Sequence, residues 1–131
     1  MVSTRGRYAL RVMIDIANNQ GDGYVPMKDV AARQGLSLKY LEQILPLLTK
    51  NNLVEGIQGK GGGYKLTRVA KDYTVGEILR ATEKDMAPVS CLASGADKCL
   101  RRGECKTIGF WEGYNKVMNE YIDGVTLSDL L

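Results

Sequence analysis

Apolar side chains recur at steps of three and four residues along five stretches of the chain, with polar and charged side chains between them. This spacing gives a helix one apolar face, so each stretch predicts an amphipathic helix. The last stretch, of about 18 residues, would span roughly 27 Å. The five stretches are residues 7–17, 27–34, 37–50, 74–83 and 106–123.

The second and third predicted helices are separated by a short turn. Gly35 stands where a residue in the left-handed conformation commonly ends a helix, and Ser37 is a suitable N-cap for the next helix. Two helices joined in this way are typical of a helix-turn-helix. Pro46 lies inside the second of them, where it removes one backbone hydrogen bond, so we expect a kink or a loosened last turn there.

After Val54 the apolar pattern changes from helical to alternating. Ile57 precedes the glycine-rich segment 59–63, which contains Lys60, and Tyr64 and Leu66 follow it. The pattern predicts a β-hairpin with a basic tip. A helix-turn-helix followed by such a hairpin is typical of a winged helix. We therefore expect a mainly α fold with a small β-hairpin, in which a winged helix-turn-helix domain is followed by a long C-terminal helix.

Three units follow from this organisation. We assign residues 1–84 to the winged helix-turn-helix domain, residues 85–105 to a cysteine-containing loop, and residues 106–131 to the C-terminal helix and a terminal turn. Thr126 and Asp129 have the spacing of a capping box for that turn. The sequence has no apolar run of the roughly 18 to 20 residues that a membrane helix needs, and no signal-peptide core. We expect a cytoplasmic protein with no membrane partner.

The composition excludes several classes of enzyme. The 131 residues are 44% hydrophobic and 25% charged, as in an ordinary globular domain, and they include no histidine. Ser-His-Asp and Cys-His catalysis and His-ligated zinc are therefore excluded. We expect a protein that is not an enzyme.

Charge is distributed unevenly along the chain. Residues 1–71 contain eleven Lys or Arg against five Asp or Glu, a net of +6, whereas residues 72–131 contain seven against ten, a net of −3. A basic half is expected of a protein that binds the phosphate backbone of nucleic acid. The alternative is an ordinary solvated surface. The basic clusters of this half are Arg5, Arg7 and Arg11, and Lys60, Lys65, Arg68 and Lys71.

The outward face of the third helix carries the candidate base-reading residues. In a winged helix this element enters the major groove, and Gln43 has the donor and acceptor that pair with an adenine edge. The alternatives are a polar face without a function and a winged helix that binds only proteins. The outward residues are Lys39, Tyr40, Glu42, Gln43 and Thr49.

Three cysteines, Cys91, Cys99 and Cys105, lie within fifteen positions of the loop. An odd number in a cytoplasmic chain argues against a disulfide framework. Three thiolates close to basic residues suit an iron-sulfur cluster, because cysteine sulfur is the usual ligand of such clusters. A zinc site and free thiols remain alternatives on spacing alone.

Several motifs together resemble the iron-sulfur cluster regulator (IscR-like) family of Rrf2/BadM-type winged-helix transcription factors. They are RGRYALRVMIDIA, LSLKYLEQIL, NNLVEGIQGKGGGYKL, TVGEIL, the three cysteines, a downstream Trp and TLSDLL, and they cover nearly the whole chain. The resemblance implies a dimeric, DNA-binding transcription factor. It implies that Lys39, Tyr40, Glu42 and Gln43 lie in the major groove, that Gln58 and Lys60 lie at the wing, and that Cys91, Cys99 and Cys105 bind the cluster.

The chain departs from the family pattern at two positions. Gln58 stands where members that read the minor groove usually have an arginine, and Ile108 stands where the best-known members have a histidine ligand. Lys60 restores the charge at the wing but not the planar donor fork of arginine. The candidates for the fourth ligand are a carboxylate such as Asp97 or Glu104, a residue from the first helix of the partner subunit, or a small external ligand. The sequence leaves open whether the cluster is 2Fe-2S or 4Fe-4S.

We therefore expect a repressor-type regulator of iron-sulfur, iron or sulfur metabolism genes that binds double-stranded DNA at an inverted repeat. The alternatives are a metal-free thiol redox switch in the same fold and, from a different class, an iron-sulfur electron carrier or a protein-interaction adaptor. An apolar seam on the last helix predicts a homodimer. The seam comprises Ile108, Trp111, Tyr114, Met118 and Ile122.

Overall fold

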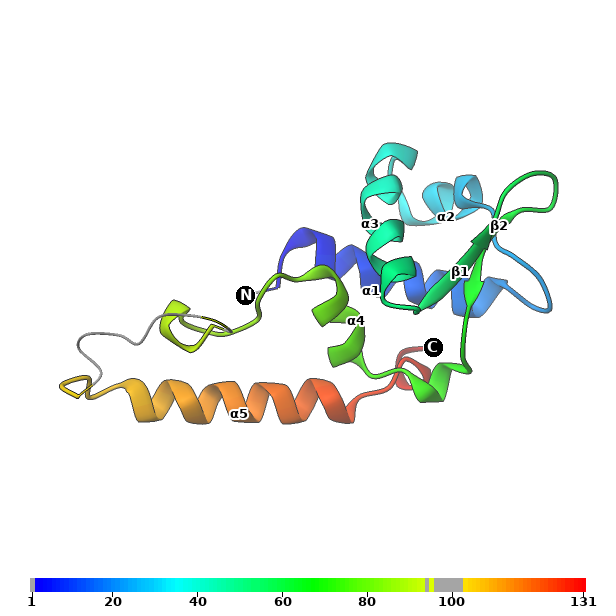
Figure 1. The fold of residues 1–131 in the computed structure, drawn as a ribbon. Coiled ribbons are helices and arrows are strands. Elements are labelled where there is room, and N and C mark those ends of the chain that lie inside the picture. Colours follow the sequence, from blue (N-terminus) through cyan, green and yellow to red (C-terminus); the bar gives the residue numbers. More distant parts are fainter. Residues whose placement is uncertain (1, 94, 96–102) are drawn as a thin grey trace.

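The computed structural model describes residues 2–93, 95 and 103–131. Within these residues it contains five α-helices, a two-stranded antiparallel hairpin and three short 3-10 turns (Figure 1). Cys99 and Asp97, both expected at the cluster, lie outside the described residues. The elements in chain order are α1 (Thr4–Asn19), α2 (Met27–Gln34), α3 (Leu38–Lys50), β1 (Val54–Ile57), β2 (Gly63–Leu66), η1 (Ala70–Asp72), α4 (Val75–Thr82), η2 (Ser90–Leu92), α5 (Ile108–Gly124) and η3 (Ser128–Leu130).

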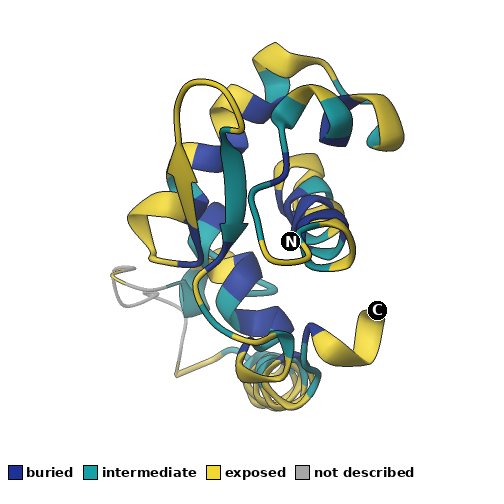
Figure 2. Ribbon diagram, turned by 90° about the vertical axis from the view of Figure 1, so that its right-hand side faces the viewer, coloured by how far each residue is buried: buried dark blue, intermediate teal, exposed yellow. Residues whose placement is uncertain are grey.

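Helices α1 to α4 and the hairpin enclose one main core, and α5 runs beneath α4 and projects past them (Figure 1). The apolar stripes expected from the sequence supply this core, which includes Val12 and Ile16 of α1 and Leu41 and Ile44 of α3, each 0% exposed. The dark blue residues of Figure 2 lie where these helices and the hairpin meet. The expected fold class is therefore confirmed.

The turn of the helix-turn-helix has the expected chemistry. Gly35 ends α2 with φ 66°, in the left-handed region, and its N–H donates to the carbonyl of Ala31. The Ser37 hydroxyl accepts from the backbone N–H of Tyr40 at 3.0 Å and so caps α3. Helix α3 continues through Pro46 to Lys50. These contacts fix where the first turn of α3 begins.

The hairpin pairs Val54 with Leu66 at its base and Ile57 with Gly63 at its tip. A close approach ties it to the segment before α2. Gly63 has φ 149°, and a Cβ there would lie 2.1 Å from the carbonyl oxygen of Val25. Only glycine allows the backbone bridge between Tyr64 and Val25 that holds the hairpin against α2.

Tyr73, which is 0% exposed, joins the hairpin to α4. Its hydroxyl donates to the carbonyl of Leu53 at 2.7 Å and accepts from the N–H groups of Thr67 at 2.9 Å and Arg68 at 3.1 Å. One side chain thus provides partners for three backbone groups at the point where the chain leaves the hairpin.

Helix α5 is joined to α4 by one polar contact and a small apolar cluster. Arg80 donates to both carboxylate oxygens of Asp123, at 2.6 and 3.0 Å, and to the side-chain oxygen of Asn119 at 2.7 Å. Gly76 lies directly under this ion pair, since a Cβ there would lie 2.1 Å from Asp123 Oδ1. Val75, Leu79, Met86 and Ile122 form the apolar cluster.

The chain then turns back toward η1. Thr126 N–H donates to the Asp129 carboxylate at 2.9 Å, and Asp129 N–H donates to the Thr126 hydroxyl at 3.2 Å, so the expected capping box is formed. Among the described residues, no helix has the length and apolar character to cross a membrane.

Candidate nucleic-acid interface and cysteine segment

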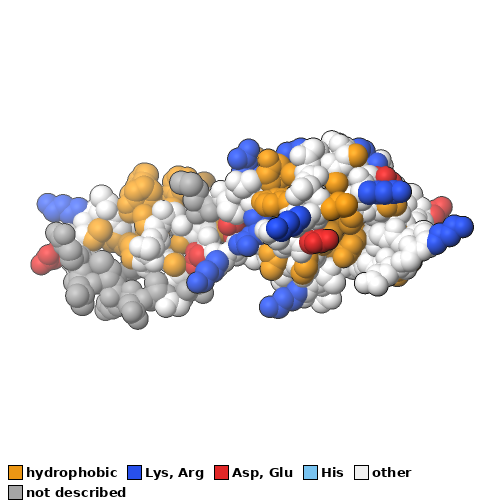
Figure 3. Space-filling model, turned by 90° about the horizontal axis from the view of Figure 1, so that it is seen from above, with side chains coloured by type: hydrophobic (Ala, Val, Ile, Leu, Met, Phe, Trp, Pro, Cys, Tyr) orange, Lys and Arg blue, Asp and Glu red, His pale blue; other side chains and the backbone are white. Residues whose placement is uncertain are grey.

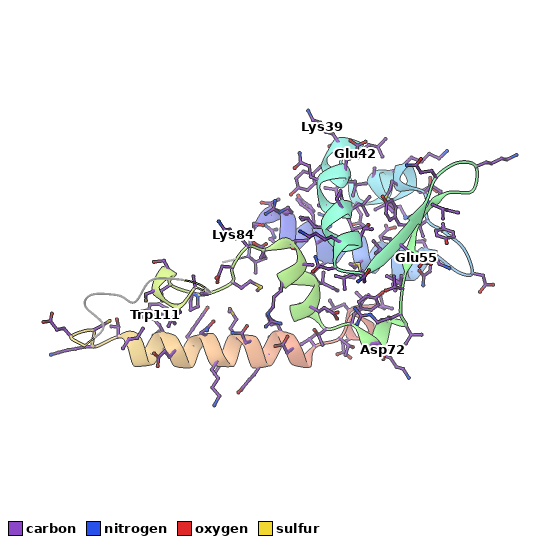
Figure 4. All side chains as sticks on the ribbon, viewed as in Figure 1. Lys39, Glu42, Glu55, Asp72, Lys84 and Trp111 are labelled. Atoms are coloured by element: carbon purple, nitrogen blue, oxygen red, sulfur yellow. The ribbon has the colours of Figure 1, made fainter. Side chains whose placement is uncertain are left out.

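The first turns of α3 present polar side chains on the upper face of the winged helix. Lys39 and Glu42 project from this face in Figure 4, and Gln43 beside them is also exposed. The inward positions of the same helix, Leu41 and Leu45, are buried. Helix α3 therefore separates an apolar face that holds it in the core from a polar face whose donors and acceptors can reach base edges.

Tyr40 occupies a position between these two faces. It is half-buried, and its ring meets the Tyr8 ring edge-on, with centroids 5.6 Å apart and planes at 84°. The Arg11 guanidinium lies over the same Tyr8 ring, 4.8 Å from its centroid. Tyr40 thus packs α3 against α1, a structural contact that the sequence pattern did not indicate.

A buried carboxylate sets the position of α2. Asp15 of α1 is 3% exposed and accepts from both Nε and Nη2 of Arg33, at 3.0 and 2.7 Å, and from the Gln34 amide at 2.8 Å. Burial alone would raise the pKa of Asp15. The hydrogen bonds from Arg33 and Gln34 and the charge of Arg33 outweigh burial and lower the pKa. Arg11 completes the network by donating to the side-chain and backbone oxygens of Gln34.

The wing places Gln58 and Lys60 at an exposed tip. Gly59 and Gly61 flank Lys60 with φ of 95° and 78°, values that L side chains rarely adopt. The turn therefore depends on glycine on both sides of the lysine. Gln58 also lines a recess of about 200 Å³ between the hairpin and Thr49 of α3.

Several basic residues of the N-terminal half contact other parts of the protomer. Lys65 pairs with Glu55 at 3.2 Å and Arg68 with Glu77 at 2.5 Å, while Arg11 holds Gln34. These contacts raise the pKa of Lys65 and of Arg68, chiefly through the hydrogen bonds to Glu55 and Glu77. Glu55 is already counted in the net charge of +6, but Glu77 lies outside residues 1–71, so its pair with Arg68 lowers the net positive charge that faces a ligand. Figure 3 shows the remaining Lys and Arg side chains spread around the upper face.

A shallow cavity of about 270 Å³, here termed the α3 notch, opens where α2, α3 and β2 meet. Its lining residues are apolar apart from Glu42, which carries a carboxylate, and Tyr64, which carries a phenolic hydroxyl. Leu38, at the first position of α3, is 49% exposed at this site. Figure 3 shows hydrophobic side chains on this face with acidic and basic groups among them. The notch is lined by Met27, Leu38, Leu41, Glu42, Leu45, Pro46 and Tyr64.

Two of the three expected cluster ligands lie in the described residues. Cys91 is in η2 and Cys105 precedes α5; both are half-buried, and Cys105 Sγ lies 3.4 Å from the Thr107 hydroxyl. Among the described residues, no three side chains of the His, Cys, Asp and Glu types gather as a metal site. Ile108 is half-buried and has no donor atom, and Glu104 is exposed.

The end of the winged helix is held against the start of α1. Glu83, the residue after α4, accepts from the backbone N–H of Ser3 at 2.8 Å and from its hydroxyl at 2.7 Å. Ser3 in turn caps α1, accepting from the N–H of Gly6 at 3.3 Å. The point from which the chain leaves the winged helix for the cysteine-containing loop is therefore fixed by a contact within the winged helix.

The exposed apolar stripe of α5 lies beside the expected seam. Ile122 is buried against α4, and Met118 packs on the same cluster, so these two side chains contact their own protomer. Trp111 and Ile108 are half-buried. Figure 2 shows α5 end-on with most of its circumference exposed. The strongly exposed residues are Phe110 (64%), Tyr114 (51%), Val117 (65%) and Tyr121 (71%).

A helix-turn-helix whose second helix presents polar side chains beside a glycine-tipped wing defines a winged-helix DNA-binding regulator. A family model described as Rrf2, iron-dependent transcriptional regulator, matches residues 2–131. The chain therefore belongs to the Rrf2 family of transcriptional regulators, which are not enzymes.

Individual relatives agree with this assignment. The chain is 35% identical over 130 residues to the HTH-type transcriptional regulator IscR of Klebsiella pneumoniae (strain 342), covering 99% of this chain and 78% of that protein. The structure of T. potens IscR superposes with a TM-score of 0.78 at 36% identity, covering 99% of this chain and 85% of that one. CymR, described as the global cysteine regulator of B. subtilis, superposes with a TM-score of 0.79 at 34% identity, covering 99% and 95%.

Proposed function

We propose that the protein is a homodimeric regulator of iron-sulfur, iron or sulfur metabolism genes, and that an iron-sulfur cluster on Cys91, Cys99 and Cys105 sets its affinity for DNA. The observation that carries the proposal is the placement of these cysteines. They lie in residues 85–105, which link the winged helix to α5 and begin two residues after Glu83, whose carboxylate holds the N-cap residue of α1.

In this proposal α3 enters the major groove. Lys39, Glu42 and Gln43 meet base edges and phosphates there, and Tyr40 holds the helix against α1. Lys60 at the wing tip contacts a phosphate, and Gln58 approaches the minor groove. A two-fold dimer presents two such surfaces and recognises an inverted repeat.

The cysteine side chains of residues 85–105 are suitable ligands for an iron-sulfur cluster. Three thiols are available on one segment, with Lys106 beside Cys105 in the sequence, and cysteine sulfur is the preferred ligand of iron in such clusters. When bound, the cluster supplies a group whose charge and integrity respond to oxidants. In this proposal the response passes from the cysteine-containing loop to α1 by way of Glu83, which accepts from the backbone N–H of Ser3. Asp97 and Glu104 are candidates for the fourth ligand.

A metal-free thiol switch is the second candidate, and two observations favour it. Ile108 has no donor atom at the position where the resembling family has a histidine, and the fold superposes on a protein described as a cysteine regulator. In this case oxidation of the cysteine thiols would change the conformation of the cysteine-containing loop without any metal.

The two candidates separate in one experiment. The protein is purified anaerobically, its visible absorption, iron and sulfide are measured, and DNA duplexes are selected from a random library with the protein in its metal-loaded and metal-free forms. Cys→Ala at each of the three positions should abolish the absorption, whereas Ser90→Ala, an exposed neighbour of Cys91 in η2, should retain it.

The selected duplexes should bind the metal-loaded and metal-free forms with different affinities, because a cluster that regulates must bind the two conformational states unequally. Failure of the reconstituted protein to hold iron and sulfide would contradict the cluster. Peroxide-sensitive DNA binding without metal would then establish the thiol switch, and stoichiometric zinc would indicate a structural metal site.

A further inference from the structure

The α3 notch has a composition suited to one kind of base edge. Its floor is formed by Leu41 and Leu45, which are 0% and 3% exposed, and Leu38 stands half-exposed at its rim. Glu42 provides the only charge among its lining residues. A carboxylate repels phosphate oxygens and the carbonyl oxygens of thymine and guanine, but it accepts a hydrogen bond from an amino group, which cytosine offers at N4 and adenine at N6. Beside adenine the carboxylate would also face the N7 acceptor, so cytosine is the better partner.

The position of the notch argues for a base rather than a metabolite. It has a volume of about 270 Å³ and shares Glu42 with the exposed polar face of α3. Lys39 projects from the same face (Figure 4), which is the surface assigned to the major groove. A base edge needs only part of this space.

Leu38 and Glu42 are four residues apart on one helix, so their side chains are neighbours on its surface. On a cytosine the C5 position is adjacent to the N4 amino group, and both face the major groove. A carboxylate that meets N4 therefore brings the neighbouring leucine to C5. The Ser37 cap fixes the turn from which both side chains project.

We infer that Leu38 and Glu42 together read the N4 and C5 positions of a cytosine in each half-site, and that the notch binds 5-methylcytosine more tightly than unmodified cytosine. The inference rests on the proposed placement of α3 in the major groove. It adds a specificity-determining residue, Leu38, and a modified base as its ligand. Burial of the added methyl group corresponds to about a fourfold gain in affinity per half-site.

The test uses a duplex selected from a random library by the wild-type protein. Each cytosine of that duplex is replaced in turn by 5-methylcytosine, and the dissociation constants are measured by fluorescence anisotropy. One cytosine per half-site should give the gain of about fourfold. Thymine at the same position has the methyl group but an acceptor in place of the amino group, and should bind at least about fivefold more weakly than cytosine.

Two variants assign the effect to the two side chains. Leu38→Ala should abolish the gain from methylation and retain the preference for cytosine over thymine, whereas Glu42→Gln should lose that preference. Leu131→Ala is the matched control, because it makes the same truncation at a residue with 52% exposure at the end of the chain, and it should behave as the wild type.

Three results would overturn the inference: methylation that has no effect at any cytosine, a gain that persists in Leu38→Ala, or thymine bound as well as 5-methylcytosine by the wild type. Failure of the proposed function is distinguishable, since the wild-type protein would then select no duplex at all. Circular dichroism melting of each variant checks that the fold is retained.

Discussion

At the scale of single residues, Asp15 shows how a buried charge orients the surface proposed to bind DNA. Its carboxylate receives three hydrogen bonds from Arg33 and one from Gln34, the last two residues of α2. A buried carboxylate without such donors would be protonated or unstable. Asp15 therefore fixes the end of α2 against α1, and with it the turn that leads into α3.

The pKa of Asp15 gives a prediction for stability against pH. The pKa is lowered from 3.8 in the folded state, so the stabilisation by this group is complete above the unfolded pKa and is lost as pH falls through the folded value. Asp15→Asn should lower the free energy of unfolding at neutral pH, and the difference from wild type should shrink below about pH 4. Urea unfolding at about pH 7, 5 and 3 measures this difference.

The matched control is Asp22→Asn, an exposed aspartate in the turn after α1. It should leave the free energy of unfolding unchanged at all three pH values. A wild-type minus Asp15→Asn difference that stays constant down to pH 3 would show that Arg33 does not hold the carboxylate in its charged form.

Tyr73→Phe removes one buried hydroxyl and leaves the carbonyl of Leu53 and the N–H groups of Thr67 and Arg68 without that partner. The expected loss is about 1–3 kcal/mol in the free energy of unfolding, because buried polar groups lose their hydrogen bonds while the ring still fills its space. Thermal or urea unfolding measures it. Ser128→Ala, which removes a hydroxyl from an exposed residue of η3, is the control and should be neutral.

At the scale of elements, α3 and the wing should contribute differently to DNA binding. Gln43→Ala on α3 should cost roughly 1–3 kcal/mol on a selected duplex and relax the base preference at one position per half-site. The reason is that its amide has both a donor and an acceptor for an adenine edge. Repeating the selection with the variant shows which position loses its preference. An unchanged set of selected duplexes would remove Gln43 from base reading.

Lys60→Ala at the wing tip should weaken binding to selected and random duplexes alike. Each phosphate contact that is lost releases one fewer counterion, so the slope of log affinity against log salt should decrease by about one. Lys71→Ala, an exposed lysine in η1 away from the wing, is the control. A loss confined to the selected duplex would show that Lys60 reads sequence instead of charge.

The elements and their caps could be predicted because each depends on neighbouring residues. Gly35, Ser37 and the pair of Thr126 and Asp129 signal their turns within three positions of sequence. At the start of α4 the Thr74 hydroxyl accepts from the N–H of Glu77, but the Glu77 carboxylate binds Arg68 and does not return to the backbone of Thr74. Arg68 lies nine residues before Glu77, so the local sequence pattern does not indicate this ion pair.

The role of Asp15 and the direction of the two apolar faces of α5 could be predicted only in part, because both depend on contacts with residues distant in sequence. Asp15 resembles any polar residue of an amphipathic helix, and only its buried position shows its role. On α5 the apolar residues face two directions. Ile122 and Met118 turn toward α4, whereas Phe110, Val117 and Tyr121 face outward, and one helical period fits both sets. The sequence indicated an apolar helix without showing which face its own protomer covers.

At the scale of the whole molecule, the exposed stripe of α5 gives a test of the proposed dimer. Val117, 65% exposed, lies in this stripe between Tyr114 and Tyr121. Val117→Asp should shift the protein from dimer to monomer in sedimentation velocity at micromolar concentration, because a carboxylate would be buried in an apolar contact. Melting should show the winged helix still folded, since this side chain contributes little to the core.

Lys116→Asp introduces the same carboxylate on the same helix at a side chain that is 77% exposed, and it should remain dimeric. A wild-type protein that sediments as a monomer would contradict the dimer through α5. Equal effects of the two substitutions would indicate a general loss of helix stability instead of a contact with a second protomer.

In the proposed dimer, the ion pair of Arg80 with Asp123, packed over Gly76, would set how far apart the two DNA-reading surfaces stand. In a dimer joined through α5, each winged helix is attached to the shared helices by this joint and by the backbone bond from Val75 N–H to the Val125 carbonyl. Successive major grooves on one side of a duplex are about 34–36 Å apart. In such a dimer, the angle between the winged helix and α5 at this contact would therefore set the number of base pairs between half-sites. Helix α3 would set the base sequence of each half-site. Two relatives with identical recognition helices would bind the same half-site sequence at different half-site spacings if the contact between α4 and α5 differed in angle.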